Sequence, residues 1–95
     1  MKENILICKD TFSRYQNFTF NSIKFIKDYK YNCIEIYNFE ESNGWYTSYV
    51  KPKNDKYYKS YMVNNISFTK YEIKKYFFTP LEYRKAKIER LELLN

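Results

Sequence analysis

The chain has 95 residues and a formal net charge of +6 at pH 7, with one glycine and no histidine. A domain of this length buries only about 60–65% of the surface that its unfolded chain exposes, so a deep internal pocket is not expected. Histidine is the commonest general acid or base near neutral pH, and loops that bind phosphates or dinucleotides need several glycines, so the composition argues against an enzyme and against a bound cofactor.

The first predicted element is a short apolar run at residues 4–9, which suits an inner strand. The run is too short for a signal sequence or a membrane span, so we expect a cytoplasmic protein with no membrane partner. Cys8 in this run and Cys33 further along are expected to be small buried apolar residues in a reducing compartment. A disulfide or a zinc site is the less favoured alternative, because two thiols without histidine are half of a typical ligand set.

Residues 12–30 predict two short strands joined by a turn. Phe18 and Phe20 alternate as strand residues do, and Asn21-Ser22 interrupts the pattern, so the turn is placed there. The clearest strand covers residues 31–39, where both faces carry apolar side chains. A strand of that kind belongs at the centre of a sheet.

The strand pattern resumes at residues 45–51 and again at residues 57–63, with Pro52 in the connection. We interpret residues 45–63 as one antiparallel hairpin with an apolar side.

Turns flank these strands. Asn43-Gly44 and Asn64-Asn65 are predicted tight turns, because asparagine tolerates the left-handed backbone region. Glu40-Glu41, an adjacent pair of acidic residues, is expected in a solvated turn and not in a catalytic pair.

Two segments of the form T-x-x-E predict helix starts, at Thr69–Glu72 and at Thr79–Glu82. The second also has proline at the first helical position, where its missing amide hydrogen costs nothing. Helices are therefore expected at about 70–78 and 80–94. The predicted fold is α+β, a small antiparallel sheet of four to five strands followed by two C-terminal helices, in a single domain over residues 1–95.

The second helix carries apolar residues on two sides. Leu81, Ile88 and Leu91 share one side, and one of the two sides can pack on the sheet. The other side then needs a partner or is a frayed end. A possible oligomer face on the opposite side consists of Tyr83, Leu93 and Leu94.

Residues 45–63 combine a tryptophan and several tyrosines with lysines. Tyrosine beside lysine on a sheet is one way to hold single-stranded nucleic acid, with rings on the bases and ammonium groups on the phosphates. Tyrosine is also a leading residue of protein interfaces, and an ordinary sheet with no direct role has the same composition. Arginine is scarce and the aromatic pattern of RNA-binding sheets is absent, which favours the protein interface over the nucleic acid.

Individual residues of this surface have a structural interpretation as well. For Trp45 and Tyr61 we favour a place in the core, and the lysines of the connection suit a solvated loop. The residues expected to contact a partner are Trp45, Tyr46, Tyr49, Lys51, Lys53, Lys56, Tyr57, Tyr58 and Lys59, together with Lys70, Lys74 and Lys75 on the outer face of the first helix.

Residues 31–78 resemble small accessory proteins encoded by phages and mobile elements of AT-rich bacteria. In these proteins a Tyr-rich hairpin leads into an F-x-x-x-E-[IF]-x-x-Y-F segment, matched here by Phe68, Glu72, Ile73, Tyr76 and Phe77. Several of them inhibit bacterial defence, anti-CRISPR proteins among them. The resemblance implies a non-catalytic inhibitor whose partner is a host RNA-guided nuclease, its guide RNA, or both. The alternatives are a single-stranded nucleic-acid-binding protein and a structural subunit that assembles through its second helix.

Overall fold

The computed structural model describes residues 3–16, 19–53 and 56–94. The long strand β4 (Lys30–Glu41) organises the main sheet. One edge of β4 pairs with β6 (Tyr57–Val63), and the other edge pairs first with β1 (Glu3–Cys8) and then with β5 (Gly44–Ser48). All of these pairs are antiparallel, so β4 is the central strand, as its two apolar faces predicted.

The remaining strands are short. β7 (Ile66–Phe68) extends the sheet beyond β6, and the two-residue β8 (Phe77–Phe78) extends it beyond β1. A separate two-stranded sheet is formed by β2 (Phe12–Tyr15) and β3 (Ser22–Phe25). The helices are α1 (Lys70–Tyr76) and α2 (Pro80–Leu94). The α+β architecture is therefore confirmed. The described residues form a main sheet of six strands, more than the four to five expected, because β7 and β8 have only three and two residues and leave no period in the sequence.

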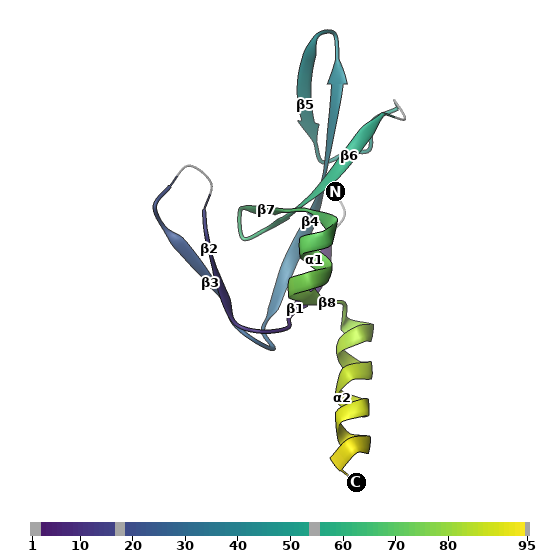
Figure 1. Ribbon diagram of the computed structural model, residues 1–95. Helices are drawn as coiled ribbons and strands as arrows, with labels where there is room; N and C mark the ends of the chain where they lie inside the picture. The colour runs from purple at the N-terminus through teal and green to yellow at the C-terminus, as the bar shows by residue number, and fades with distance from the viewer. Residues whose placement is uncertain (1–2, 17–18, 54–55, 95) are drawn as a thin grey trace.

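The hydrophobic core lies on one face of the sheet, between the sheet, the β2–β3 hairpin and α1 (Figure 1). It is largely aromatic. The buried Phe25 ring meets the rings of Phe68 and Phe77 edge-on, with centroids 5.8 Å apart in each case. Phe12 stacks on Phe25 at 4.8 Å and on Tyr76 at 4.4 Å. Large rings fill a small core with few side chains, so a short chain can close one here.

Both predicted capping boxes are present. At the start of α1, Glu72 N–H donates to Thr69 Oγ1 at 3.1 Å and Thr69 N–H donates to Glu72 Oε1 at 3.0 Å. The same reciprocal pair joins Thr79 and Glu82 at the start of α2. Helix α2 spans the predicted residues. Helix α1 ends at Tyr76, because Phe77 has an extended backbone and belongs to β8, where it pairs with Cys8 of β1.

The first hairpin differs from the prediction in the place of its turn. Ser22 is the first residue of β3 and pairs with Tyr15, so the connection lies at residues 16–21, before the expected break. Phe20 is in this connection and is fully exposed, while Ile23 and Phe25 supply the inward side chains of β3. Phe18 lies outside the described residues.

The expected hairpin over residues 45–63 is wrong. β5 and β6 do not pair with each other, because β4 lies between them and binds one on each edge. The strand period was read correctly over residues 45–48 and 57–63, whereas β5 ends at Ser48 and not at residue 51. A period of two also does not identify the partner of a strand.

The turns around these strands follow from the same register. The tight turn before β5 is Ser42-Asn43, with φ of 49° and 66°, one residue earlier than predicted, and Gly44 is already in β5. Glu40 and Glu41 end β4 and are not in a turn. The Asn64-Asn65 turn is confirmed, with φ of 50° and 63°.

Candidate functional site

The upper half of the main sheet extends beyond the core as an arm. We define the aromatic arm as residues 35–53 and 56–61, which include the end of β4, all of β5 and most of β6. Figure 1 shows these strands extending past α1 and the β2–β3 hairpin. Ile36 is buried and Tyr61 packs partly buried against the core, so the side chains that a partner can reach are those of the arm beyond these two residues.

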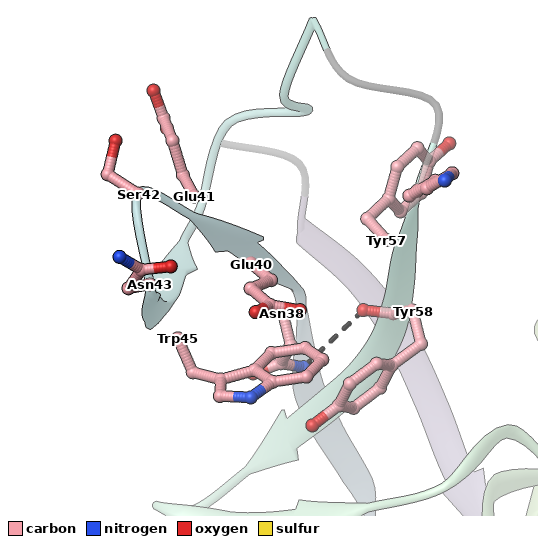
Figure 2. A pocket seen from close by; sticks show the side chains of 9 residues that line it. Asn38, Glu40, Glu41, Ser42, Asn43, Trp45, Tyr57 and Tyr58 are labelled. Atoms are coloured by element: carbon pink, nitrogen blue, oxygen red, sulfur yellow. Dashed lines mark hydrogen bonds between the residues drawn. The ribbon is translucent and has the colours of Figure 1, made fainter.

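One face of the arm carries an open cleft between two aromatic rings. Trp45 on β5 and Tyr58 on β6 lie on either side of β4, with ring centroids 6.0 Å apart and planes inclined by 58°. Trp45 is 67% exposed and Tyr58 is 59% exposed, so both residues face solvent. Figure 2 shows the two rings turned toward each other next to Asn38. Trp45, for which a core position was favoured, is thus a surface residue.

Asn38 holds the strands on both sides of this cleft. Its Nδ2 donates to Ser60 Oγ at 3.1 Å and to the Tyr58 carbonyl oxygen at 3.4 Å on β6. Its Oδ1 accepts from Thr47 Oγ1 at 3.1 Å on β5. The amide therefore connects three neighbouring strands, and this fixes the spacing of the two rings that flank it.

The cleft has a volume of about 650 Å³, and acidic side chains line its outer end. Glu40 is the register partner of Trp45, so its carboxylate leaves the same face of the sheet. Glu41 also lines the cleft, and Lys56 is the cation there. The cleft is thus acidic in a molecule that is basic overall.

The whole arm is close to neutral. Its described residues contain four lysines and three acidic residues, so almost all of the net charge of +6 comes from the rest of the chain. A surface that binds nucleic acid through phosphates needs an excess of cations. The charge of the arm therefore fits a protein partner better than a nucleic acid.

The opposite face of the arm has a closed group of rings. Tyr37 meets Tyr57 edge-on at 5.4 Å, and Phe39 lies 6.0 Å from Tyr46. Lys59 Nζ is 3.9 Å from Glu35 Oε2 and 5.7 Å from the Tyr37 ring centroid. The connection also crosses this face, since Lys51 Nζ lies 5.8 Å from the Tyr57 ring. Tyr37, Phe39 and Tyr57 on this face are half-buried, whereas Trp45 and Tyr58 contact each other but are both more than half exposed.

The sequence-predicted contact residues fall into three groups. The arm holds exposed Trp45, Tyr46, Tyr49 and Tyr58, half-buried Tyr57, and exposed Lys51, Lys53, Lys56 and Lys59. Lys70, Lys74 and Lys75 are exposed on α1, which packs on the core and not on the arm. On α2, Leu93 is 87% exposed while Tyr83 is half-buried with its ring 6.1 Å from Phe78 of the same chain, and the side chain of Leu94 is outside the described atoms.

Sequence reasoning missed Asn38 and Glu40 as parts of a site. Both lie on the even-numbered face of β4, where Ile34 and Ile36 precede them. The change from isoleucine to asparagine and glutamate along one face of a strand was the available signal, because it marks where that face leaves the apolar part of the sheet.

Reactive groups outside the arm are few. Cys8 and Cys33 are free and buried, as predicted. Burial, followed by the nearby Glu35 carboxylate, raises the pKa of Cys33 to about 11. In the described part of the chain no three cysteine, aspartate or glutamate side chains lie close enough to hold a metal ion. Neither described helix is long and apolar enough to cross a bilayer.

Comparison of the chain with protein-family models, with curated proteins and with solved structures gives no match.

Proposed function

We propose that this chain is a non-catalytic protein that inhibits a host RNA-guided defence nuclease. Its aromatic arm binds the protein surface of the nuclease. The observation that carries the proposal is the exposed Trp45–Tyr58 pair with Glu40 beside it. Exposed tryptophan and tyrosine are the residues most often found at the energetic centres of protein interfaces. The nuclease as target rests on the resemblance of residues 31–78 to phage accessory proteins.

The chemistry of the cleft specifies what it accepts. An arginine or lysine side chain of the partner can lie against the indole and phenol rings, where a cation–π contact contributes about 1–2 kcal/mol once desolvated. Glu40 is placed to pair with the same cation. A phosphate is disfavoured because two carboxylates line the cleft against one lysine. The occupant is therefore a basic side chain presented by a protein.

Inhibition is tested with guide-loaded RNA-guided nucleases of several types. Cleavage of a matching DNA target is measured while the chain is titrated in. The expected result is inhibition of at least one nuclease by the unmodified chain, with Trp45→Ala and Tyr58→Ala each weakening it by about 10- to 30-fold. Tyr71→Ala is the matched control, because Tyr71 is 74% exposed on α1 and outside the arm. If no nuclease is inhibited, or if the control weakens inhibition as much, the assignment is wrong.

The cleft itself is tested separately with the only tryptophan of the chain as the reporter. An arginine-rich peptide should change the fluorescence of Trp45, and Glu40→Gln should weaken this binding. Glu89→Gln on the exposed surface of α2 serves as the control for lost charge. If the cleft were a nucleic-acid site, Glu40→Gln would instead strengthen the binding of an oligonucleotide, because removal of a carboxylate strengthens phosphate binding.

A further inference from the structure

A second surface feature lies at the end of the sheet away from the arm, where α2 leaves the core. Here the end of β1, the turn between β3 and β4, and α2 form a small groove of about 50 Å³. Four cations line it, with one carboxylate, Asp28. The four cations are Lys9, Lys27, Lys87 and Arg90.

Two of these ammonium groups are held in place. Lys9 Nζ donates to the Lys74 carbonyl oxygen at 2.6 Å and lies 4.9 Å from the Phe78 ring centroid. Lys87 Nζ lies 4.6 Å from the centroid of Tyr83. Each cation thus rests against one of two rings that are themselves 6.1 Å apart.

The four cations lack an acidic partner of their own. Among residues 3–16, 19–53 and 56–94, none of them has a carboxylate within ion-pair distance. One of them, Lys9, nevertheless acts electrostatically on a neighbouring acidic residue, Glu82. The pKa of Glu82 is lowered first by its hydrogen bond from the Thr79 amide, and also by the charges of Lys9 and Lys74. The four cations outnumber the single carboxylate that lines the groove, which raises the energy of the free protein, and a bound polyanion would offset that cost.

We propose that this groove binds the phosphate backbone of a single-stranded nucleic acid, with Lys9, Lys27, Lys87 and Arg90 on the phosphates and Tyr83 beside a base. Nucleic acid is favoured over an acidic protein segment because the cations lie beside the Phe78 and Tyr83 rings, and the part of the half-buried Tyr83 that stays exposed can contact a base, whereas aspartate and glutamate side chains gain nothing from a ring. The proposal does not depend on the arm. Together the two sites would let one small protein contact the protein and the RNA of the same ribonucleoprotein.

The test measures fluorescence anisotropy of labelled oligouridylate and oligothymidylate strands of about 10 nucleotides, at low salt and across a salt series. The variant is Lys87→Glu combined with Arg90→Glu. Lys85→Glu is the control, because Lys85 is exposed on the same helix but does not line the groove. The double variant should lower affinity at least 10-fold and reduce the salt slope by about 1.4, which corresponds to two phosphates at about 0.7 each. The control should change affinity less than about 3-fold.

Four outcomes would overturn the proposal. The unmodified chain does not bind either strand at low salt; Lys85→Glu weakens binding as much as the double variant; polyglutamate of matched charge binds as tightly as the strands; or strand binding changes Trp45 emission, which places the strand on the arm. Equal affinity for both strands supports recognition of phosphates and bases alone, and tighter binding of RNA supports an added contact to the 2′-hydroxyl. Nuclease inhibition is measured separately. A negative result for strand binding therefore does not bear on the function proposed for the arm, and a negative result for inhibition does not bear on the groove.

Discussion

At the scale of single residues, the two thiols show how burial controls chemistry. Cys8 and Cys33 belong to the same buried cluster, and neither is in a disulfide. Burial raises the pKa of both; at Cys8 a backbone hydrogen bond at Asp10 opposes part of the rise, and the charges of Asp10 and Asp28 add to it. The Sγ–H of Cys8 also donates to the Asp10 carbonyl oxygen at 3.1 Å. Thiolates are the reactive form of cysteine, so both side chains should be inert in the folded protein.

A thiol-labelling experiment checks this expectation. At about pH 8, a free thiol with its usual pKa reacts readily with a disulfide reagent. The folded chain should react slowly at both positions, and addition of denaturant should release both thiols at the rate of global unfolding. Labelling of Cys33→Ala reports the reaction rate of Cys8 alone, and labelling of Cys8→Ala reports that of Cys33 alone. Fast reaction of either thiol without denaturant would contradict the burial seen here.

Glu72 is the residue through which pH should act on stability. Its carboxylate accepts from the Thr69 amide and is 2.7 Å from Arg14 of the β2–β3 hairpin. The hydrogen bond from Thr69, and then Arg14, hold the pKa of Glu72 below its ordinary value. The folded state therefore binds this proton less readily than the unfolded state. The resulting stabilisation is complete above the unfolded pKa of about 4.3 and is lost as pH falls through the lower folded pKa.

Urea unfolding of the unmodified chain and of Glu72→Gln, between about pH 7 and pH 3, measures this contribution. The glutamine keeps an acceptor for Thr69 but loses the charge that faces Arg14. The unmodified chain should be the more stable at neutral pH, and the two midpoints should converge in acid. Midpoints that stay equally far apart at every pH would show that the charge of Glu72 has no such role.

At the scale of elements, the two helices start in the same way but contribute differently to the fold. α1 places Ile73 and Tyr76 on the core, whereas α2 leaves Leu81, Ile88 and Leu91 more than half exposed. Loss of a capping hydroxyl costs about 1 kcal/mol where the helix is part of the cooperative unit. Thr69→Ala should lower the free energy of unfolding by about that amount. Thr79→Ala should lower it much less and instead reduce the helical signal of the folded chain.

Thermal and urea unfolding followed by both circular dichroism and Trp45 fluorescence distinguish the two cases. Thr69→Ala should shift both signals together. Equal loss of stability in the two variants would mean that α2 is part of the core unit.

The elements themselves could be read from the sequence to a large extent. The T-x-x-E segments located both helix starts, and the alternation over residues 31–39 identified the central strand, because caps and side-chain periods are local properties. The pairing of strands is not local. Residues 45–51 and 57–63 looked like a hairpin, yet β4 is 12 residues long and has room for β5 and β6 on opposite edges.

The candidate site could be predicted only in part for the same reason. Trp45 and Tyr58 were among the contact residues expected from composition, although a core position was favoured for Trp45, and their closeness depends on both strands flanking β4. In a 45–63 hairpin Asn38 and Glu40 would not lie between the two rings. The acidic character of the cleft, which separates a protein partner from a nucleic acid, therefore required the topology.

At the scale of the whole molecule, the chain is elongated. Its radius of gyration is 16.2 Å, with extents of 60 × 33 × 19 Å, whereas a compact domain of this length has a radius of about 12 Å. The arm and α2 are the two projections that account for the difference (Figure 1). The two ends of the molecule also differ in charge, because the arm is close to neutral whereas the groove beside α2 is basic. A long molecule with chemically distinct ends is suited to contacting two surfaces at once.

Small-angle X-ray scattering tests this shape. Charged residues interrupt both apolar sides of α2, and among its residues 80–93 only Tyr83 and Ala86 are half-buried. Little apolar area would therefore be gained if the helix folded back along the sheet. The radius of gyration at high dilution should therefore stay near 16 Å. A chain that ends after Thr79 should give a value much closer to that of a compact domain. A full-length value near 12 Å would show instead that α2 docks on the sheet, for example against the half-exposed Ile5. A value that rises with protein concentration, together with a doubled mass in light scattering, would mean that Leu81, Ile88 and Leu91 are covered by a second copy.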